Sequence, residues 1–395
     1  MRLSYPATAS DYQKLARATL PRFLADYLDG GASEEQTLRA NERAWQDIGL
    51  RQRVLIDAGD VDTRTELAGQ ACSMPVALAP LGLAGMLAPR GEAQAVRAAN
   101  QAGVPFTLST VGICPLEEVK AAASDPFWFQ LYMIRDRAYV ERLLNKAWGS
   151  GCRTLVFTID LPLPGPRHRD TRNGLASPGT RSAALKAWQL LSRPRWLWQV
   201  GIGGKPLTFG NLNEAVPDAV NLDSFKNWVD TQFDPSVTWE AIGWLRERWP
   251  GRLLLKGILD VEDARAAVRL RADGIVVSNH GGRQLDGVAA TASKLPAIVA
   301  AVGGDTEILV DGGIRNGVDV FRALALGAQG VMIGRPWAWA LAAEGQAGLT
   351  GLLQTWRQEL KLAMTLTGVT RIADIGMAHL DTARTIDLSM AGEQQ

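Results

Sequence analysis

A polar cluster in the second half of the chain contains the residue types needed for proton transfer. The decapeptide SNHGGRQLDG occupies residues 278–287 and directly follows the apolar run ADGIVV. Histidine is the side chain whose ordinary pKa lies nearest neutrality, which suits it to act as a general base. A guanidinium can hold a carboxylate through two parallel hydrogen bonds. His280 and Arg283 therefore indicate a site that grips an acid and removes a proton from it, whereas a structural histidine that caps a turn is the alternative.

Two further motifs combine glycine with arginine. DGGIRNG covers residues 311–317 and includes Arg315, and GRPW covers residues 334–337 and includes Arg335. Glycines allow backbone N–H groups to approach an anion, and a helix N-terminus favours negative charge. These motifs favour a site for a phosphate-bearing cofactor or substrate, and tight packing between a strand and a helix is the alternative reading.

Such residues must be positioned by regular elements, and the chain shows eight short apolar runs that alternate with amphipathic segments. Runs of this kind are typical of strands buried on both faces of a parallel sheet. The alternation predicts a (β/α)8 TIM barrel over residues 1–395 as a single domain, with residues 1–73 as an N-terminal helical cap. An open doubly wound sheet is the runner-up, but no GxGxxG motif follows the first run. The predicted strands are 75–80, 105–110, 128–132, 154–160, 252–258, 273–279, 307–313 and 330–335.

Chemistry in such a barrel takes place at the carboxyl ends of the strands. Nearly every predicted strand ends in polar residues or glycine, which places these residues on one rim. Asp160, at the end of the fourth predicted strand, could reach the imidazole of His280 and stabilise its charged form. The strand-end residues are Ala79, Pro80, Ser109, Gln130, Tyr132, Thr158, Asp160, Lys256, Ser278, His280, Asp311, Gly313, Gly334 and Arg335.

The overall composition argues against several classes of protein. The net charge is +1, from 42 basic and 41 acidic residues, so nucleic acid is not expected as a partner. The three cysteines, Cys72, Cys114 and Cys152, are widely spaced and form no CxxC motif. A disulfide framework or a zinc site is therefore not expected, no metal is assigned, and a reducing cytosol fits better. The first twenty residues do not resemble a signal peptide.

A long insertion interrupts the alternation between residues 160 and 252, and we assign its basic, tryptophan-rich part to residues 171–235. Residues 167–205 contain eight basic residues and a single acid, Asp170. Ser182, Lys186, Gln189 and Arg193 share one helical face, while Ala184, Leu185, Trp188 and Leu191 share another, and Trp196 and Trp198 follow. Basic residues beside apolar, tryptophan-rich surface are typical of a helix that lies in the bilayer interface. A lid over the site and a subunit contact are the alternatives.

Several motifs, in their order and spacing, resemble one known family over nearly the whole chain. They are YLDGGA (27–32), MPVALAPLG (74–82), LSTV (108–111), WFQLY (128–132), TIDLPLPGPRHRD (158–170), LLLKGI (253–258), SNHGGRQLDG (278–287) and DGGIR (311–315). Together they resemble the FMN-dependent L-α-hydroxy-acid oxidases and dehydrogenases. Within this family the chain is most similar to the quinone-linked L-lactate dehydrogenases of bacteria, and next to the mandelate dehydrogenases.

The resemblance implies a role for individual residues. Tyr27 and Arg283 would bind the substrate carboxylate with help from Arg167, and Tyr132 would orient the substrate. His280 would take a proton, and Asp160 would stabilise the imidazolium. The residues expected to hold FMN are Ala79, Pro80, Leu81, Ser109, Gln130, Thr158, Lys256, Ser278, Asp311, Gly313, Arg315, Gly334 and Arg335.

The resemblance also implies a reaction and partners. The expected reaction converts an L-2-hydroxy acid, foremost L-lactate, to its 2-keto acid, and electrons pass to a quinone. The protein would lie peripherally on the anionic cytoplasmic face of the cell membrane, as a homo-oligomer, by resemblance a tetramer. Val111 matches the lactate enzymes in size, although Gly82 leaves room for an aromatic acid. The alternatives are an L-mandelate dehydrogenase, a soluble oxidase that uses oxygen and, more distantly, a non-redox barrel that binds phosphate.

Overall fold

Eight parallel strands form one sheet, in the order β4-β11-β10-β9-β8-β7-β6-β5, in the computed structural model, which describes residues 5–175, 177, 179–215 and 232–381. A parallel bridge between Leu78 and Phe106 joins β4 to β5 and closes the sheet. The predicted (β/α)8 barrel is thus confirmed, and each predicted run contains one strand. The strands are β4 (Val76–Leu78), β5 (Thr107–Ser109), β6 (Trp128–Leu131), β7 (Thr154–Thr158), β8 (Arg252–Ile258), β9 (Gly274–Val277), β10 (Glu307–Val310) and β11 (Gly330–Ile333).

One helix follows each barrel strand and covers the outside of the sheet. Asp136, Asp260 and Asn316 cap three of these helices by accepting a backbone N–H with their side chains. The helices are α5 (Gly91–Ala102), α6 (Leu116–Ala122), α7 (Arg137–Gly149), α12 (Glu240–Arg248), α13 (Val261–Arg269), α14 (Thr291–Val302), α15 (Gly317–Ala325) and α16 (Arg335–Thr367). A short helix, α4 (Ala84–Leu87), precedes α5, and α16 is kinked at Glu344 and Gly345.

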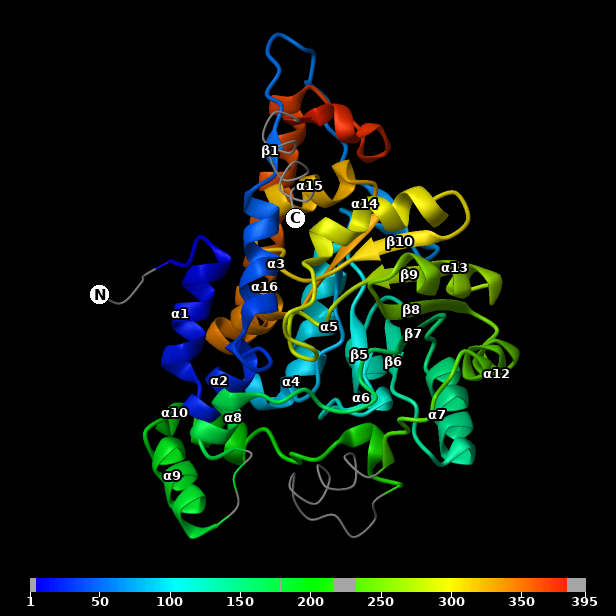
Figure 1. Ribbon diagram of the computed structural model, residues 1–395. Helices are drawn as coiled ribbons and strands as arrows, with labels where there is room; N and C mark the ends of the chain where they lie inside the picture. The colour runs from blue at the N-terminus through cyan, green and yellow to red at the C-terminus, as the bar shows by residue number, and fades with distance from the viewer. Residues whose placement is uncertain (1–4, 176, 178, 216–231, 382–395) are drawn as a thin grey trace, which may run out of the picture.

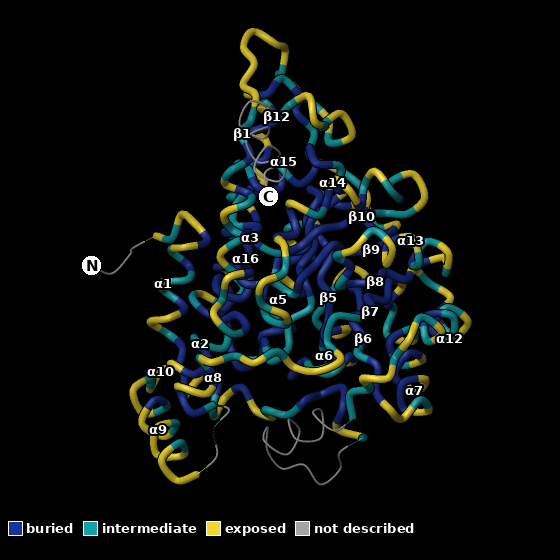
Figure 2. Tube along the Cα trace, viewed as in Figure 1, coloured by how far each residue is buried: buried dark blue, intermediate teal, exposed yellow. Residues whose placement is uncertain are grey.

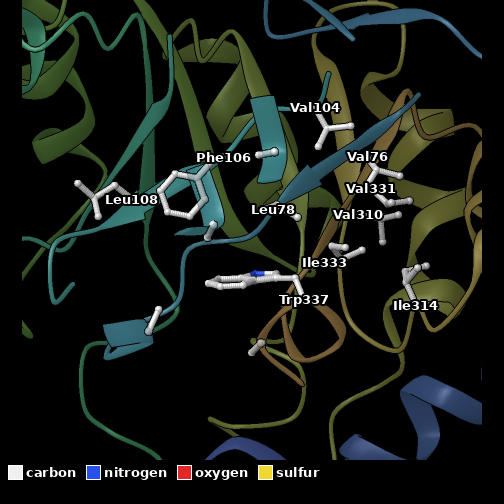
Figure 3. Close-up of a cluster of buried hydrophobic side chains, with 14 of the residues drawn as sticks. Val76, Leu78, Val104, Phe106, Leu108, Val310, Ile314, Val331, Ile333 and Trp337 are labelled. Atoms are coloured by element: carbon white, nitrogen blue, oxygen red, sulfur yellow. The ribbon is translucent and has the colours of Figure 1, made fainter. Parts of the chain in front are cut away.

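The strands are buried on both faces, which explains their continuous apolar runs. Side chains such as Val156, Leu254 and Leu309 form a core inside the barrel. The outward side chains pack against the helices, as Figure 3 shows for Leu78 and Ile333 beside Trp337 of α16. Phe106 meets Trp337 edge to face, with ring centroids 6.3 Å apart. This double burial fixes the position of each strand end, where the polar residues begin.

The N-terminal segment is helical only in its first part. The helices α1 (Ala9–Thr19), α2 (Arg22–Asp29) and α3 (Gln36–Gln46) lie beside α16 and the barrel (Figure 1). Within the predicted helical cap of 1–73, however, β2 (Thr65–Leu67) and β3 (Gln70–Cys72) form an antiparallel hairpin. Ala68 and Gly69 have φ angles of 47° and 77°, the conformation that a two-residue hairpin turn requires. Near the C-terminus, η3 (Ile372–Asp374) and η4 (Met377–His379) lead to β12 (Leu380–Asp381), which pairs with β1 (Gly49–Leu50).

The insertion after β7 forms several short helices at one end of the molecule. They are α8 (His168–Arg172), α9 (Thr180–Leu191), α10 (Pro194–Trp196), the π-helix η1 (Leu197–Ile202) and the 3-10 helix η2 (Gly210–Leu212). The helix α9 contacts α2, and most of its surface is exposed (Figure 2). Residues 176, 178 and 216–231 of the predicted insertion lie outside the described residues. Across the described part of the chain, the helices lack the combination of length and hydropathy needed to cross a bilayer.

Candidate active site

His280 and Asp160 meet on the rim, beyond the carboxyl ends of β9 and β7, the two strands that flank β8. The imidazole Nδ1 lies 2.9 Å from Oδ1 of Asp160. The backbone of His280 is left-handed, with a φ of 56°, and Gly281 and Gly282 continue in the same conformation. A Cβ at Gly282 would lie 2.6 Å from the backbone nitrogen of Leu38, so only glycine fits this turn. The two glycines of SNHGGRQLDG therefore allow the chain to turn sharply and direct the imidazole toward Asp160.

The charge on Asp160 determines what the imidazole can do. Burial by itself would raise the pKa of Asp160, but His280 and Lys256 together lower it below its ordinary value. An ionised carboxylate here accepts a hydrogen bond from Nδ1–H, and in that tautomer Nε2 is the nitrogen that can take up a proton. This pair can therefore take up one proton at Nε2 and stabilise the resulting positive charge.

Tyr27, Arg167 and Arg283 come together from three segments far apart in the sequence. The guanidinium carbons of Arg283 and Arg167 lie 4.8 Å and 5.4 Å from the centroid of the Tyr27 ring. One nitrogen of Arg283 donates to the carbonyls of Tyr27 and Gly30 at 2.7 Å and 2.9 Å. Arg167 donates from Nε to Asp170 at 2.7 Å. Two arginines and a phenol around one point suit the binding of a carboxylate.

Tyr132 lies near both groups. Burial is the main cause that raises its pKa, and Asp160, Tyr27 and Arg283 are all close enough to act on this pKa. Tyr132 therefore keeps its proton and can donate a hydrogen bond. Its ring is packed against Phe233, with centroids 4.9 Å apart. Phe233 could not be predicted as a site residue, because it lies at the end of the insertion rather than at the end of a strand.

Lys256, in β8, contacts residues that follow β9 and β10. Its ammonium lies 3.0 Å from Oδ2 of Asp311 and donates to the hydroxyl of Ser278 at 3.0 Å. The same hydroxyl accepts the backbone N–H of His280 at 3.0 Å. Burial would lower the pKa of Lys256, but Asp311 and Asp160 outweigh burial and raise it. A fixed positive charge thus lies inside the rim, beside the histidine.

Ser109, Gln130 and Thr158 line the rim at the ends of β5, β6 and β7. Oε1 of Gln130 accepts from the Ser109 hydroxyl at 3.0 Å and from the backbone N–H of Thr110 at 3.3 Å. This arrangement orients the amide so that its Nε2 points away from those donors. Among the described residues, Nε2 of Gln130 and Oγ1 of Thr158 have no hydrogen-bond partner although both are buried.

The two predicted phosphate motifs are engaged in contacts of their own. Arg335 donates from three nitrogens to the carbonyls of Leu28, Gly281 and Gly30, at 3.0, 2.9 and 2.8 Å. Arg315 lies 2.6 Å from Oε1 of Glu42. Arg335 therefore ties the segment after Tyr27 to the segment after His280. A guanidinium has five N–H groups, so both arginines keep donors for a further group, and phosphate binding by them remains a prediction.

The remaining predicted residues surround these groups. Ala79, Pro80 and Leu81 directly follow β4, and the carbonyl of Ala79 accepts from Trp337 at 3.2 Å. Gly313 lies against α3, where a Cβ would be 2.2 Å from the carbonyl oxygen of Asn41. At Gly334, by contrast, a Cβ would meet no protein atom within 4 Å, so packing alone does not require glycine there.

Comparison with known proteins decides the family. The model of the FMN-dependent dehydrogenases matches residues 16–382. The chain belongs to the FMN-dependent dehydrogenase family. It is 50% identical over 374 residues to the L-lactate dehydrogenase of Yersinia pestis strain Pestoides F, with 95% of this chain and 98% of that protein covered. The L-lactate dehydrogenase of Yersinia pseudotuberculosis serotype O:1b matches equally well, with 50% identity and the same coverage.

Solved structures of similar proteins share the whole fold of this FMN-dependent dehydrogenase. The monotopic membrane protein (S)-mandelate dehydrogenase superposes with a TM-score of 0.90 at 33% identity, covering 96% of this chain and 100% of that chain. Mandelate oxidase superposes with a TM-score of 0.81 at 38% identity, covering 95% of this chain and 98% of that chain. The predicted fold and family are thus confirmed together.

The rim of this FMN-dependent dehydrogenase fits its cofactor. Gln130, Thr158 and Asp311 each keep one buried polar atom without a partner among the described residues. Such atoms cost free energy unless a ligand satisfies them. The flavin ring system has both carbonyls and an N–H, and the ribityl chain has hydroxyls, so these atoms suit an FMN molecule laid along the rim. When bound, FMN supplies the capacity to accept the two electrons of the oxidation.

Proposed function

We propose that this FMN-dependent dehydrogenase oxidises an L-2-hydroxy acid to the 2-keto acid, with L-lactate as the preferred substrate. The main support is the pairing of His280 with Asp160 at 2.9 Å, beside the cluster of Tyr27 and Arg283. A base and a carboxylate-binding group on one rim match the two ends of a 2-hydroxy acid. The 50% identity to L-lactate dehydrogenases supports lactate among such acids.

The proposed mechanism assigns each step to a residue on the rim. Arg283 and Tyr27 bind the substrate carboxylate, and Arg167 adds positive charge. Tyr132 donates a hydrogen bond that orients the substrate. Nε2 of His280 takes the proton of the substrate hydroxyl, and the Asp160 carboxylate stabilises the imidazolium that forms. Lys256 keeps its positive charge beside the cofactor's place on the rim and favours negative charge developing there.

Steady-state assays of the purified holoenzyme test this function. We expect reduction of an artificial dye with L-lactate and no reduction with D-lactate, because the carboxylate and the base occupy fixed places. Oxygen uptake should be much slower than dye reduction if the acceptor is a quinone. No dye reduction with any 2-hydroxy acid would refute the function, and oxygen uptake as fast as dye reduction would favour the oxidase alternative.

Mandelate is the second candidate substrate, and Val111 is the residue that bears on it. A Cβ added at Gly82 would lie 2.8 Å from Cγ2 of Val111, so the valine itself fills the room that Gly82 leaves. Both mandelate enzymes among the structural relatives have the same fold, so the fold does not decide the substrate. We propose that Val111 limits the size of the substrate side chain.

Val111→Ala should shift the preference toward aromatic acids. Removing two methyl groups opens space beside Gly82, and we expect the ratio of kcat/KM for L-mandelate to that for L-lactate to rise by about tenfold. Val104→Ala removes the same atoms from the buried outer core and serves as the matched control, with no change of the ratio. If Val111→Ala has the same ratio as the wild type, Val111 does not limit the size of the substrate side chain.

We also propose that the insertion attaches the enzyme to a membrane surface, because α9 exposes its apolar face to water and buries part of its polar face. The polar face of the helix is turned inward: Gln189 is only 2% exposed, accepts the N–H of Phe23 at 2.8 Å and donates to the carbonyl of Asn173 at 3.0 Å. Arg193 donates to the carbonyl of Leu20 at 3.0 Å. The apolar face is left outside, where Trp188 and Leu191 are 66% and 71% exposed.

The neighbouring turns extend this apolar surface. Trp198 and Ile202 are 70% and 55% exposed, while Arg181 and Arg195 add exposed positive charge. Tryptophan with basic residues suits the boundary of an anionic leaflet, which in cells is the cytoplasmic one. The related (S)-mandelate dehydrogenase is a monotopic membrane protein, which supports the same attachment here. Peripheral attachment to that face would let a quinone take the electrons, and a homotetramer stays a proposal from resemblance.

Trp188→Glu/Leu191→Glu should release the enzyme from membranes. Each side chain buried in lipid contributes about 1.5–3 kcal/mol, so the partition coefficient for anionic vesicles should fall by about 100-fold or more. Sedimentation with vesicles measures this effect, and bound FMN should be retained. Leu362→Glu, at a 58% exposed site on the far end of α16, is the matched control that should still sediment. Equal sedimentation of the double variant and the wild type would contradict the attachment.

A further inference from the structure

We propose that Asn211 is a positioning residue for the substrate pocket, because its side-chain amide holds both ends of the segment that carries Val111. Asn211 lies in η2, the last described turn of the insertion before residue 216, and is only 3% exposed. The inference rests on the proposed function for its consequence in substrate choice, but the contacts themselves do not depend on it.

The amide of Asn211 joins two points seven residues apart. Its Oδ1 accepts the backbone N–H of Leu116 at 2.9 Å, and its Nδ2 donates to the backbone carbonyl of Ser109 at 3.2 Å. Only one orientation of the amide satisfies both contacts, since one partner is a donor and the other an acceptor. Ser109 ends β5 and Leu116 begins α6, so one side chain clamps the whole connection between them.

The contact with Leu116 replaces a missing helix cap. The residue before α6 is Pro115, whose side chain has no atom that could accept a hydrogen bond. A helix N-terminus leaves its first N–H groups without partners inside the helix. Asn211 supplies an acceptor from 95 positions along the chain. The position of α6, and of the loop that enters it, therefore depends on the insertion.

The backbone around Asn211 strengthens the clamp. Gly210 donates its N–H to the carbonyl of Gly112 at 3.0 Å, and a Cβ at Gly210 would lie only 2.5 Å from the nitrogen of Pro115. The carbonyl of Asn211 accepts the hydroxyl of Tyr139 at 2.5 Å. The turn η2 is thus pressed against residues 112–115 and fixed from behind by α7.

Val111 is the residue of this connection that we propose to limit substrate size, and it is not fully buried. Its neighbours on the outer side are occupied: Glu92 accepts the N–H of Ile113 at 2.8 Å, and Gly112 is bound by η2. Val111 itself lies against Gly82, and its N–H is directed toward the Ser109 hydroxyl at 3.3 Å. A shift of the clamp would therefore move the side chain that limits substrate size together with Ser109 on the rim.

The same stretch of the insertion is tied to its membrane-facing part. Arg90 donates to the carbonyls of Gly204 and Pro206, at 3.3 Å and 2.9 Å, between η1 and η2. Trp196 donates from its indole to the carbonyl of Met86 at 2.8 Å. The insertion is thus held to residues 86–90 both before and after η1. Deletion of residues 177–215 would remove Asn211 along with the membrane face.

Three variants of the holoenzyme separate the clamp from general packing. Asn211→Ala removes both amide contacts, Asn211→Asp keeps the acceptor for Leu116 but loses the donor to Ser109, and Tyr139→Phe loosens η2 without touching the amide. Hydrogen exchange of the amides of residues 110–118 measures the clamp directly. The kcat and KM for L-lactate and L-mandelate measure its consequence for the pocket.

We expect Asn211→Ala to speed exchange in residues 110–118 by about tenfold or more, since the donor of Leu116 loses its buried partner. The KM for L-lactate should rise by about tenfold with kcat within about twofold, and the preference for L-lactate over L-mandelate should weaken. Asn211→Asp should keep the Leu116 N–H protected yet show the weakened preference. Tyr139→Phe keeps both amide contacts, so it should lower Tm while changing exchange and preference less than Asn211→Ala does.

Hydrogen exchange of residues 110–118 in Asn211→Ala at the wild-type rate would overturn the proposal. A change of substrate preference in Tyr139→Phe as large as that in Asn211→Ala would also overturn it. If Asn211→Ala does not fold, an unchanged preference in Asn211→Asp overturns the coupling to the pocket. A wild-type enzyme that oxidises no 2-hydroxy acid would instead refute the proposed function, and the exchange results would still decide the clamp.

Discussion

His280→Gln is expected to lower kcat with L-lactate by about 10³-fold while FMN stays bound. General bases contribute roughly 10²- to 10⁴-fold to a reaction, and glutamine keeps a similar size but cannot take a proton. The ionised Asp160, 2.9 Å from Nδ1, has no function in proton transfer without the imidazole. Asp160→Asn should therefore also lower kcat, because it removes the charge that stabilises the imidazolium.

Steady-state kinetics of the single and double variants test this unit. The effects of substitutions on kcat are not additive when the residues act together. The kcat of His280→Gln/Asp160→Asn should therefore lie within about threefold of the kcat of His280→Gln. His379→Gln, in η4 on another part of the molecule, is the matched control and should keep its kcat. A His280→Gln enzyme that retains a tenth of wild-type kcat would show that another group takes the proton.

Lys256→Met is expected to have the second large effect, on stability. Lys256 is 4% exposed and pairs with Asp311 at 3.0 Å, so methionine leaves a buried carboxylate without its cation. Breaking a buried ion pair on one side costs about 3–5 kcal/mol. It also removes the donor to Ser278, whose hydroxyl holds the backbone N–H of His280. The free energy of unfolding in urea should fall by that amount, and FMN should dissociate more readily.

The double variant Lys256→Met/Asp311→Asn provides the control. Removing both charges eliminates the unpaired carboxylate, so the double variant should be more stable than Lys256→Met by about 1–3 kcal/mol. The contrary result, a double variant at least as unstable as Lys256→Met, would show that the ion pair does not account for the loss. FMN retention, read from absorbance after gel filtration, should remain impaired in both variants.

The barrel could be predicted because its strands are buried on both faces. The runs LLL in β8 and IVV in β9 are apolar without alternation, a pattern typical of a parallel sheet that is covered on both faces. The hairpin of residues 65–72 was missed, since its strands are three residues each and its turn residues Ala68 and Gly69 lack the Asn-Gly signature. Strands of three residues are too short to show the alternation of apolar and polar side chains from which a strand is predicted.

The site could be predicted to the extent that strand ends share a rim. The meeting of His280 with Asp160 follows from two parallel strands that end at one edge, and Arg283 follows three positions later. Phe233 and Asn211 come from the insertion, whose place on the barrel has no such geometric rule. Likewise, the sequence does not indicate that the three donors of Arg335 are engaged by backbone carbonyls.

We propose that His280 and Arg283 hold a 2-hydroxy acid while its two electrons pass to bound FMN. The most direct measurement is the visible absorbance of the purified holoenzyme mixed with L-lactate in the absence of oxygen. We expect the yellow absorbance to be lost within the time of one turnover, and D-lactate to leave it unchanged. A holoenzyme that stays yellow with L-lactate and with every other L-2-hydroxy acid would contradict it.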